Sequence, residues 1–263
     1  MRVRFSQLFT RKNLFRGLIV LFSVVFLVSA GFLADYIIKS VKQKKQFGAL
    51  SNMLGGSNGN YTSVIHPKTG ETVKILPEFA TLFNQNPDLV GWIKINNTII
   101  DYPVMQTPDY QNYYLQRDFY EHYSKHGTIY VRETADIKAP SDNLTIFGHK
   151  MNDGTMFSDL LKYKDQSFFL QSPTISFNTL YDRHDYQIMS VFLVDTTDEN
   201  YFRYYQFVDG DAEQFNEYVA QCKALSLYDT GITAADGDKL ITLSTCDDDI
   251  KTGRVVVVAK QIK

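Results

Sequence analysis

The chain has 263 residues, of which 44% are hydrophobic and 21% are charged, and its formal net charge is −2. This length supplies one core of conventional size and excludes two large domains. Residues 1–38 hold five basic side chains and one acidic side chain, so the rest of the chain carries a net charge of −6. A mildly acidic body lacks the basic surface that nucleic acids require, and nucleic-acid binding is therefore excluded.

The first strong signal is an uncharged, mostly apolar run of 18 residues at positions 17–34, with basic residues before it. A bilayer core needs about 20 such residues, and the flanking residues extend the span. Because the run has no polar face, a buried core helix explains it poorly. We expect residues 1–40 to form a cytoplasmic tail and a transmembrane anchor. The alternative is a cleaved secretory signal, since VSA resembles a cleavage site.

Charge favours an orientation only weakly, because lysines at positions 39, 42, 44 and 45 follow the apolar run. We expect the N-terminus inside and the body outside, as in a single-pass protein of the cell membrane. The body is exported under either interpretation. Residues 41–75 are expected to form an extracellular helix and linker, with a polar helix to about residue 54 and a flexible break at GGSNGN, residues 55–60.

Residues 76–263 have the pattern of a globular domain in which short β-like runs outnumber helices. A hairpin is expected where two of these runs flank Asn96 and Asn97. The β-like runs are 90–95, 98–104, 127–133, 143–149, 174–180, 186–195, 239–245 and 254–262. The helical patterns are 77–86, 108–117, 155–163 and 211–225. Many strands with few helices predict a mainly β fold, a barrel or a sandwich with helical insertions.

The chain has two cysteines, Cys222 and Cys246, which export would allow to form one disulfide. Cys222 recurs at helical spacing with Phe215 and Val219, so we interpret it as a small buried apolar residue. Cys246 instead stands where a β-like run gives way to a polar loop, a common position for reactive groups. A free thiol in an exported protein calls for a chemical reason, and Cys246 is the candidate nucleophile.

His149 is the candidate partner of Cys246, because it follows an apolar run and a glycine that permits close approach. Both residues would then lie at strand ends, and two strand ends of one sheet can meet at one rim. The other histidines are interpreted as solvated loop residues; these are His66, His122, His126 and His184.

Arg254 opens the last β-like run, where it is either a solvated residue or a fixed positive charge that stabilises an oxyanion. The acids Asp247, Asp248 and Asp249 are interpreted as solvating a loop. They do not resemble a metal site, because no further ligand cluster adjoins them.

Other cysteine chemistries fit the sequence less well. Seven residues separate Cys246 from Arg254, where a tyrosine-phosphatase loop has five and adds a glycine-rich cradle. The papain-type signature is absent, and His149 precedes the cysteine instead of following it. There is no CxxC pair and no SHGC run.

Three segments together resemble class B sortases, the cysteine transpeptidases of Gram-positive bacteria. TLSTC at 242–246, with an arginine after seven residues, resembles their C-terminal catalytic motif. IFGHKMNDGTMF at 146–157 resembles their histidine segment, and NPDLVGWIKINNTIIDYPVMQT at 86–107 resembles the start of their catalytic domain. The resemblance covers roughly residues 76–263, and the motifs occur in the family's order.

The resemblance implies an eight-stranded sortase-type β-barrel with peripheral helices, preceded by the transmembrane helix. It makes Cys246 the nucleophile, His149 the acid and base, and Arg254 the group that binds the oxyanion or positions the substrate. It also assigns substrate-groove positions to Ser244, Leu115 and Tyr204.

The reaction implied by the resemblance is transpeptidation without a metal or an organic cofactor. A surface protein with a C-terminal sorting signal, NPxTN-like or PxTG-like, is cleaved after threonine and joined to a peptidoglycan amine. The alternatives are a pilin-polymerising sortase, a secreted cysteine protease, and a barrel used only for binding.

Overall fold

The computed structural model describes residues 11–56, 59–247 and 252–262, and the chain divides into two units, Met1–Gln46 and Phe47–Lys263. Helix α1 runs over Arg11–Met53. Its most apolar 18-residue window has a mean hydropathy of 2.6 and none of it is buried. In the described part of the chain, α1 is the one helix that is long and apolar enough to cross a membrane.

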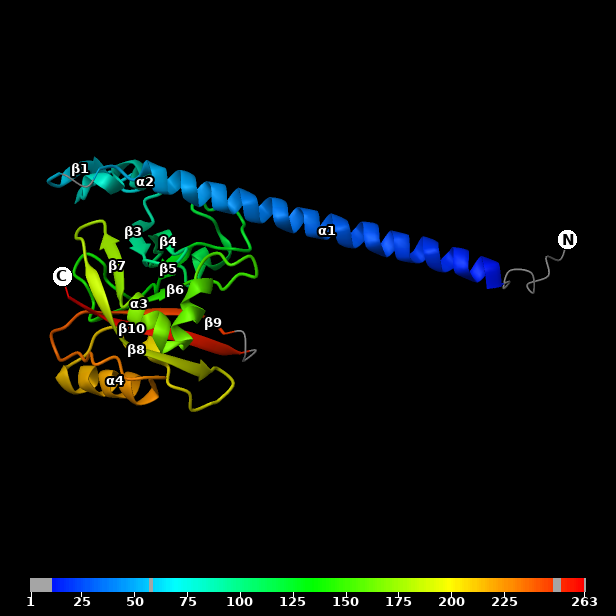
Figure 1. The fold of residues 1–263 in the computed structure, drawn as a ribbon. Helices are drawn as coiled ribbons and strands as arrows, with labels where there is room; N and C mark the ends of the chain where they lie inside the picture. The colour runs from blue at the N-terminus through cyan, green and yellow to red at the C-terminus, as the bar shows by residue number, and fades with distance from the viewer. Residues whose placement is uncertain (1–10, 57–58, 248–251, 263) are drawn as a thin grey trace. The chain divides into compact units, whose positions relative to one another are not determined.

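A closed barrel of eight strands fills the second unit, in the order β10-β8-β7-β3-β4-β5-β6-β9 (Figure 1). Its strands are β3 (Leu89–Lys94), β4 (Asp101–Met105), β5 (Ile129–Val131), β6 (Asn143–Phe147), β7 (Thr174–Thr179), β8 (Asp185–Asp195), β9 (Leu240–Cys246) and β10 (Gly253–Gln261). Each of the eight predicted β-like runs lies on one of these strands. The predicted eight-stranded barrel is therefore confirmed.

The predicted hairpin is β3 and β4, which pair antiparallel from Leu89↔Met105 to Lys94↔Asp101. Asn97 lies in its turn with φ at 61°, a left-handed conformation that asparagine tolerates better than most residues. A second hairpin, β1 (Thr62–Ile65) with β2 (Thr72–Ile75), lies within the stretch expected to be a linker. Its short strands alternate exposed residues with partly or fully buried ones, so no continuous apolar run marks them in the sequence.

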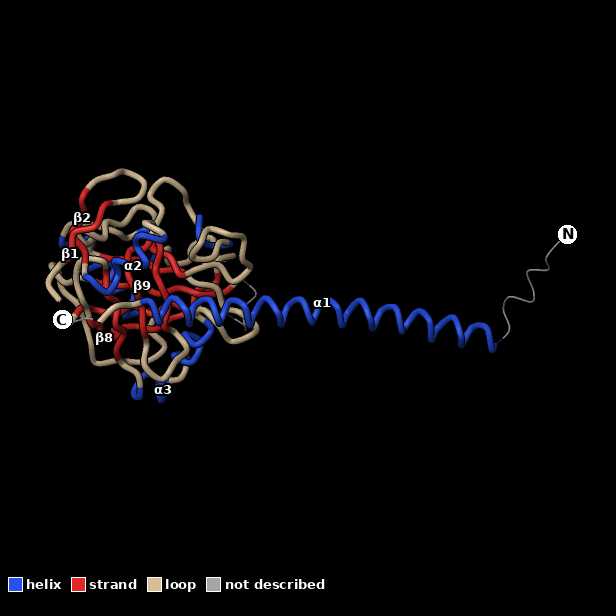
Figure 2. Tube along the Cα trace, turned by 90° about the horizontal axis from the view of Figure 1, so that it is seen from above, coloured by secondary structure: helices blue, strands red, loops and turns tan. Residues whose placement is uncertain are grey.

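Within this unit the barrel strands occupy the middle, loops and short helices lie around them, and β1 and β2 lie at one edge (Figure 2). Short helices come before and between the strands: η2 (Pro77–Phe79), α2 (Ala80–Gln85), η3 (Tyr113–Gln116), η4 (Ser158–Lys164), α3 (Gln166–Gln171) and η5 (Tyr204–Gln206). Helix α4 (Ala212–Leu225) is the longest of this unit and begins with a capping box in which Asp211 and Gln214 satisfy each other's backbone N–H groups.

Strand β10 is apolar on both faces because it separates two cores. Val257 and Ala259 belong to the core inside the barrel, whereas Val256 and Val258 pack in a second cluster with α4. Successive side chains of a strand point to opposite faces, so a continuous apolar run is the pattern that two buried faces require. Cys222 of α4 lies in the second cluster, fully buried and free of any disulfide, as its helical spacing predicts.

Leu243→Ala tests the core on which β9 rests. Leu243 is fully buried inside the barrel, so its truncation should lower the free energy of unfolding by about 2–5 kcal/mol. The measurement is urea unfolding, with Leu170→Ala as the control, because Leu170 is 69% exposed and its truncation should cost less than about 0.5 kcal/mol. Equal losses from the two variants would contradict the assignment of Leu243 to the core.

Candidate active site

Three strand ends meet at one rim of the barrel. They carry the three candidate catalytic residues, His149, Cys246 and Arg254. β6 and β9 are parallel, with Phe147 opposite Ser244, so their carboxyl ends reach the same rim. β10 runs antiparallel to β9, so its amino end reaches that rim as well, with Arg254 opposite Cys246. Strand direction alone therefore brings His149, Cys246 and Arg254 together.

Gly148 lets the chain continue from β6 to His149 against the barrel wall. Its N–H donates to the carbonyl of Ser244 at 3.2 Å, which extends the contact with β9. A Cβ atom at this position would lie 2.4 Å from Cδ1 of Ile129 and 2.7 Å from Cδ2 of Phe157. Only glycine fits so close an approach, as the sequence predicts.

His149 is oriented by a backbone carbonyl. Its Nε2 lies 2.8 Å from the carbonyl oxygen of Leu115. A carbonyl oxygen only accepts, so Nε2 carries the proton and, in the neutral ring, Nδ1 keeps its lone pair. Gly127, with φ at 61°, supports this arrangement: a Cβ atom there would lie 2.4 Å from the same carbonyl oxygen.

Burial lowers the pKa of His149 below its ordinary value of 6.5, because a low-dielectric surrounding disfavours the imidazolium. The hydrogen bond to Leu115 opposes this shift, and electrostatic interactions with His126 and Arg254 add to it. The neutral ring is therefore favoured at neutral pH.

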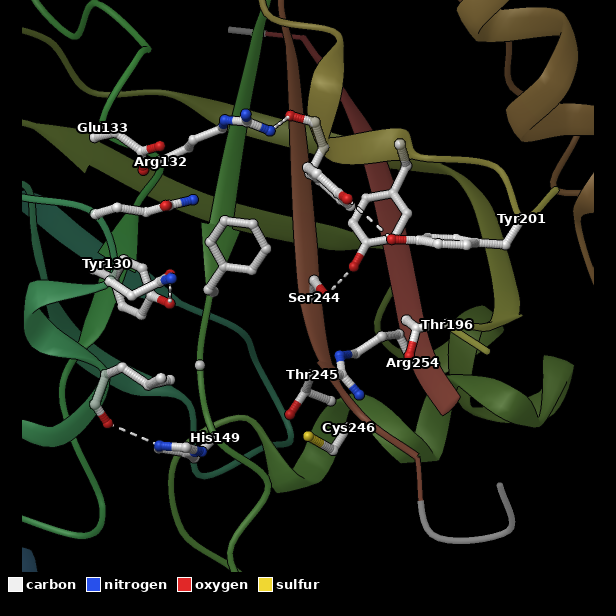
Figure 3. Close-up of a pocket in the computed structure, with 17 residues that line it drawn as sticks. Tyr130, Arg132, Glu133, His149, Thr196, Tyr201, Ser244, Thr245, Cys246 and Arg254 are labelled. Carbon is white, nitrogen blue, oxygen red and sulfur yellow. Dashed lines mark hydrogen bonds between the residues drawn. The ribbon is translucent and has the colours of Figure 1, made fainter. Parts of the chain in front are cut away.

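Cys246 is exposed at the last position of β9 and has a free thiol. In Figure 3 its sulfur points across the pocket toward His149, and the side chain of Arg254 lies next to it. The guanidinium of Arg254 is held by a hydrogen bond from Nη1 to the carbonyl of Gly253 at 2.9 Å. A thiol, an imidazole and a fixed cation at one rim are the functional groups that an enzyme with a cysteine nucleophile requires.

A groove of about 540 Å³ extends from these three residues, and all three predicted groove residues line it: Ser244, Leu115 and Tyr204. The Tyr204 hydroxyl and Ser244 Oγ are 2.6 Å apart in a hydrogen bond, and burial raises the pKa of Tyr204 to about 12. Tyr204 therefore stays a neutral phenol, and its hydrogen bond to Ser244 fixes this part of the groove wall.

Other groove residues were not identified from the sequence. They are Gln111, Asn112, Tyr130, Arg132, Glu133, Phe147, Gly148, Thr196, Tyr201, Tyr205 and Thr245. Tyr201 and Tyr205 bond each other through their hydroxyls at 2.9 Å, and both belong to the aromatic run that contains Tyr204. That run was a signal in the sequence, whereas the others come from separate segments that only the barrel closure brings together.

Two interpretations of polar residues were wrong. His126 is not solvated: it is buried, and its Nε2 lies 2.9 Å from Oδ2 of Asp153, whose side chain is only 8% exposed. Asp247 does not solvate the loop either, because its side chain is fully buried and lies 2.7 Å from Nζ of Lys164. Asp248 and Asp249 lie outside the described residues. In the described ranges, no three His, Cys, Asp or Glu side chains come together as a metal site.

A family model for the sortase domain matches residues 93–262. Sortase B of Listeria monocytogenes is 32% identical over 191 residues, which are 72% of this chain and 76% of that protein. Sortase B of Staphylococcus aureus is 35% identical with the same coverage.

Solved structures of sortase B are similar to this fold as well. Sortase B from B. anthracis in complex with AAEK1 has a TM-score of 0.72 at 27% identity, over 86% of this chain and 99% of that one. A Staphylococcus aureus sortase B–substrate complex has a TM-score of 0.72 at 28% identity with the same coverage. The chain belongs to the sortase family of transpeptidases, in its class B group.

His149 should titrate below pH 6.5 in an NMR experiment, because its burial favours the neutral ring. At neutral pH its ¹⁵N shifts should report the tautomer with the proton on Nε2, which the bond to Leu115 selects. The resonances are assigned by their loss in His149→Gln. A midpoint above 6.5, or a proton on Nδ1, would contradict this description of the site.

Proposed function

We propose that the chain is a membrane-anchored cysteine transpeptidase of the cell surface. It cleaves a C-terminal sorting signal, NPxTN-like or PxTG-like, after threonine and transfers the protein to a peptidoglycan amine. The observation that carries the proposal is the meeting of Cys246, His149 and Arg254 at one end of a single groove. The solved sortase B–substrate complex supports the extension to a sorting-signal substrate.

In the acylation step, the Cys246 thiolate attacks the threonine carbonyl carbon and forms a C–S bond. The carbonyl oxygen becomes an oxyanion, which the Arg254 guanidinium stabilises through charge and donors that need no rearrangement. The imidazolium of His149 gives its proton to the leaving nitrogen as the C–N bond breaks. The products are a thioester on Cys246, a free amine and a neutral His149.

In the transfer step, the acceptor amine attacks the thioester carbonyl and His149 takes a proton from its nitrogen. The C–S bond then breaks, and the sulfur leaves as a thiolate. This restores the thiolate–imidazolium pair with which the cycle began. Because the lowered pKa of His149 favours its neutral form at rest, the competent pair is a minor population and turnover is slow.

The groove suits an extended peptide whose threonine carbonyl lies at Cys246. Ser244, Leu115 and Tyr204 line the groove together with three more tyrosines, Tyr130, Tyr201 and Tyr205. Aromatic side chains supply a large, rigid contact area to a bound peptide. We propose that these residues bind the sorting signal on the amino-terminal side of its threonine.

We propose that α1 crosses the cell membrane once and holds the barrel outside. Its apolar window lies near the N-terminus and has the length that a bilayer requires. Such tethering places the groove at the surface where both the sorting signal and the peptidoglycan acceptor are found.

The function is tested with the full chain in detergent, incubated with NPxTN- and PxTG-like peptides with and without an amine. Mass spectrometry should find cleavage after threonine and a product that contains the amine. A lysine-bearing pilin peptide preferred over a peptidoglycan amine would favour the pilin polymerase. Cleavage that ignores the amine would contradict transpeptidation and favour a protease.

The matched variants separate chemistry from folding. Cys246→Ala and His149→Ala should each lower the rate about 10³-fold or more, since each removes a group that bonds to or protonates the reacting atoms. Cys222→Ala and His122→Ala should keep the rate within about twofold, because one thiol is buried away from the groove and the other side chain is 79% exposed. An active Cys246→Ala variant would refute the proposed nucleophile.

A further inference from the structure

The residue directly after Cys246 is a buried acid. The Asp247 side chain has no exposed surface, and its backbone N–H donates to the carbonyl of Gly253 at 3.0 Å, one step beyond the last pair of β9 and β10. A carboxylate taken out of water is costly unless charged or hydrogen-bonding partners compensate it. The buried carboxylate of Asp247 therefore requires a compensating partner at the strand end that carries the thiol.

Lys164 supplies a positive charge to this acid from another part of the chain. Its Nζ lies 2.7 Å from Oδ1 of Asp247, and its own side chain is only 25% exposed. Lys164 is the last residue of η4, and the residue before it, Tyr163, holds this end of the helix in place. Tyr163 is fully buried, its hydroxyl donates to the carbonyl of Ser172, and its own carbonyl accepts from the Tyr228 hydroxyl, each at 2.8 Å.

The same helix is connected to His149. The buried Phe157, which directly precedes η4, donates its N–H to the His149 carbonyl at 2.9 Å. One end of this segment thus bonds to His149, and the other end pairs with the residue after Cys246. The ion pair of Lys164 and Asp247 therefore joins the histidine segment to the cysteine strand by a contact that is separate from the strand pairing.

The pair also places two opposite charges at the strand end that carries the thiol. Of the described residues that line the groove, His149, Arg254, Arg132 and Glu133 carry an imidazole, a guanidinium or a carboxylate. Figure 3 shows His149 and Arg254 near Cys246, and Arg132 and Glu133 farther from it. Asp247 places a negative charge one residue from Cys246, which by itself opposes a thiolate. Lys164 places a positive charge beside that carboxylate, and this charge offsets the unfavourable effect of the carboxylate on a thiolate at Cys246.

We propose that Lys164 and Asp247 are positioning residues of the transpeptidase: the ion pair fixes the strand end that bears Cys246 and balances the charge beside its thiol. The inference rests on the proposed role of Cys246 as nucleophile and adds two residues to the reaction that neither bond to the substrate nor line the groove.

The two roles differ in the sign of their effects. If the pair is only a structural clamp, removing either partner loosens the same contact and changes thiol reactivity in the same direction. If it balances charge, Lys164→Met removes a positive charge and disfavours the thiolate, whereas Asp247→Asn removes a negative charge and favours it. Both substitutions approximately preserve side-chain size.

The experiment measures iodoacetamide alkylation of Cys246 against pH in the full chain in detergent, with the modified peptide identified by mass spectrometry. The midpoint of the alkylation profile should rise by about half a pH unit in Lys164→Met and fall by about as much in Asp247→Asn. The double variant Lys164→Met/Asp247→Asn removes one charge of each sign from nearly the same place, so its midpoint should return close to that of the wild type.

Lys162→Met is the matched control, because Lys162 belongs to the same helix but is 46% exposed and pairs with Asp159 instead. Its alkylation midpoint should equal that of the wild type. Shifts of one sign in both test variants, or shifts no larger than that of Lys162→Met, would overturn the inference. If Lys164→Met does not fold, a downward shift in Asp247→Asn supports the inference and an unchanged or raised midpoint overturns it.

The alkylation readout does not require a substrate, so it separates this inference from the proposed function. Midpoints that shift in opposite directions, combined with an active Cys246→Ala variant, would support the charge balance and refute the nucleophile. A dependence on Cys246 for transfer, combined with shifts of one sign, would leave the proposed function standing and overturn the role of the ion pair.

Discussion

The register of β9 between β6 and β10 is the constraint on which the site depends. Along β9, Ile241 and Leu243 face the barrel core, whereas Thr242 and Ser244 bond to Tyr218 and Tyr204 on the outer side. Cys246 follows in the outer series. A shift by one residue would turn every side chain to the opposite face, so the buried core that fixes the register also fixes the direction of the thiol.

Much of the fold was predictable because its signals are local. Each barrel strand corresponds to an apolar run in the sequence, and the left-handed Asn97 marks the turn between β3 and β4. The strand order was not predictable from the runs themselves, because pairs such as β6 with β9 join segments almost a hundred residues apart. The barrel was expected from the resemblance to class B sortases, and it is the closure that supplies the parallel pairing at the rim.

The site was predictable to the extent that its residues stand at strand ends. His149 and Cys246 stand at such ends in the sequence, and both line one groove. The errors concern polar residues whose partners are distant in sequence: His126 pairs with Asp153, and Asp247 with Lys164. A polar residue beside a glycine or within an acidic run has the local pattern of a solvated loop residue. Its burial depends on a partner that only folding brings close, so the local sequence does not reveal it.

The central claim is that acyl transfer passes through Cys246, and trapping the intermediate tests it most directly. The full chain is mixed with a sorting-signal peptide without an amine acceptor, quenched in acid and analysed by mass spectrometry. The account predicts a hydroxylamine-labile thioester on Cys246 that carries the peptide up to its threonine. An adduct on another residue, or cleavage in which the peptide never becomes attached to the protein, would contradict it.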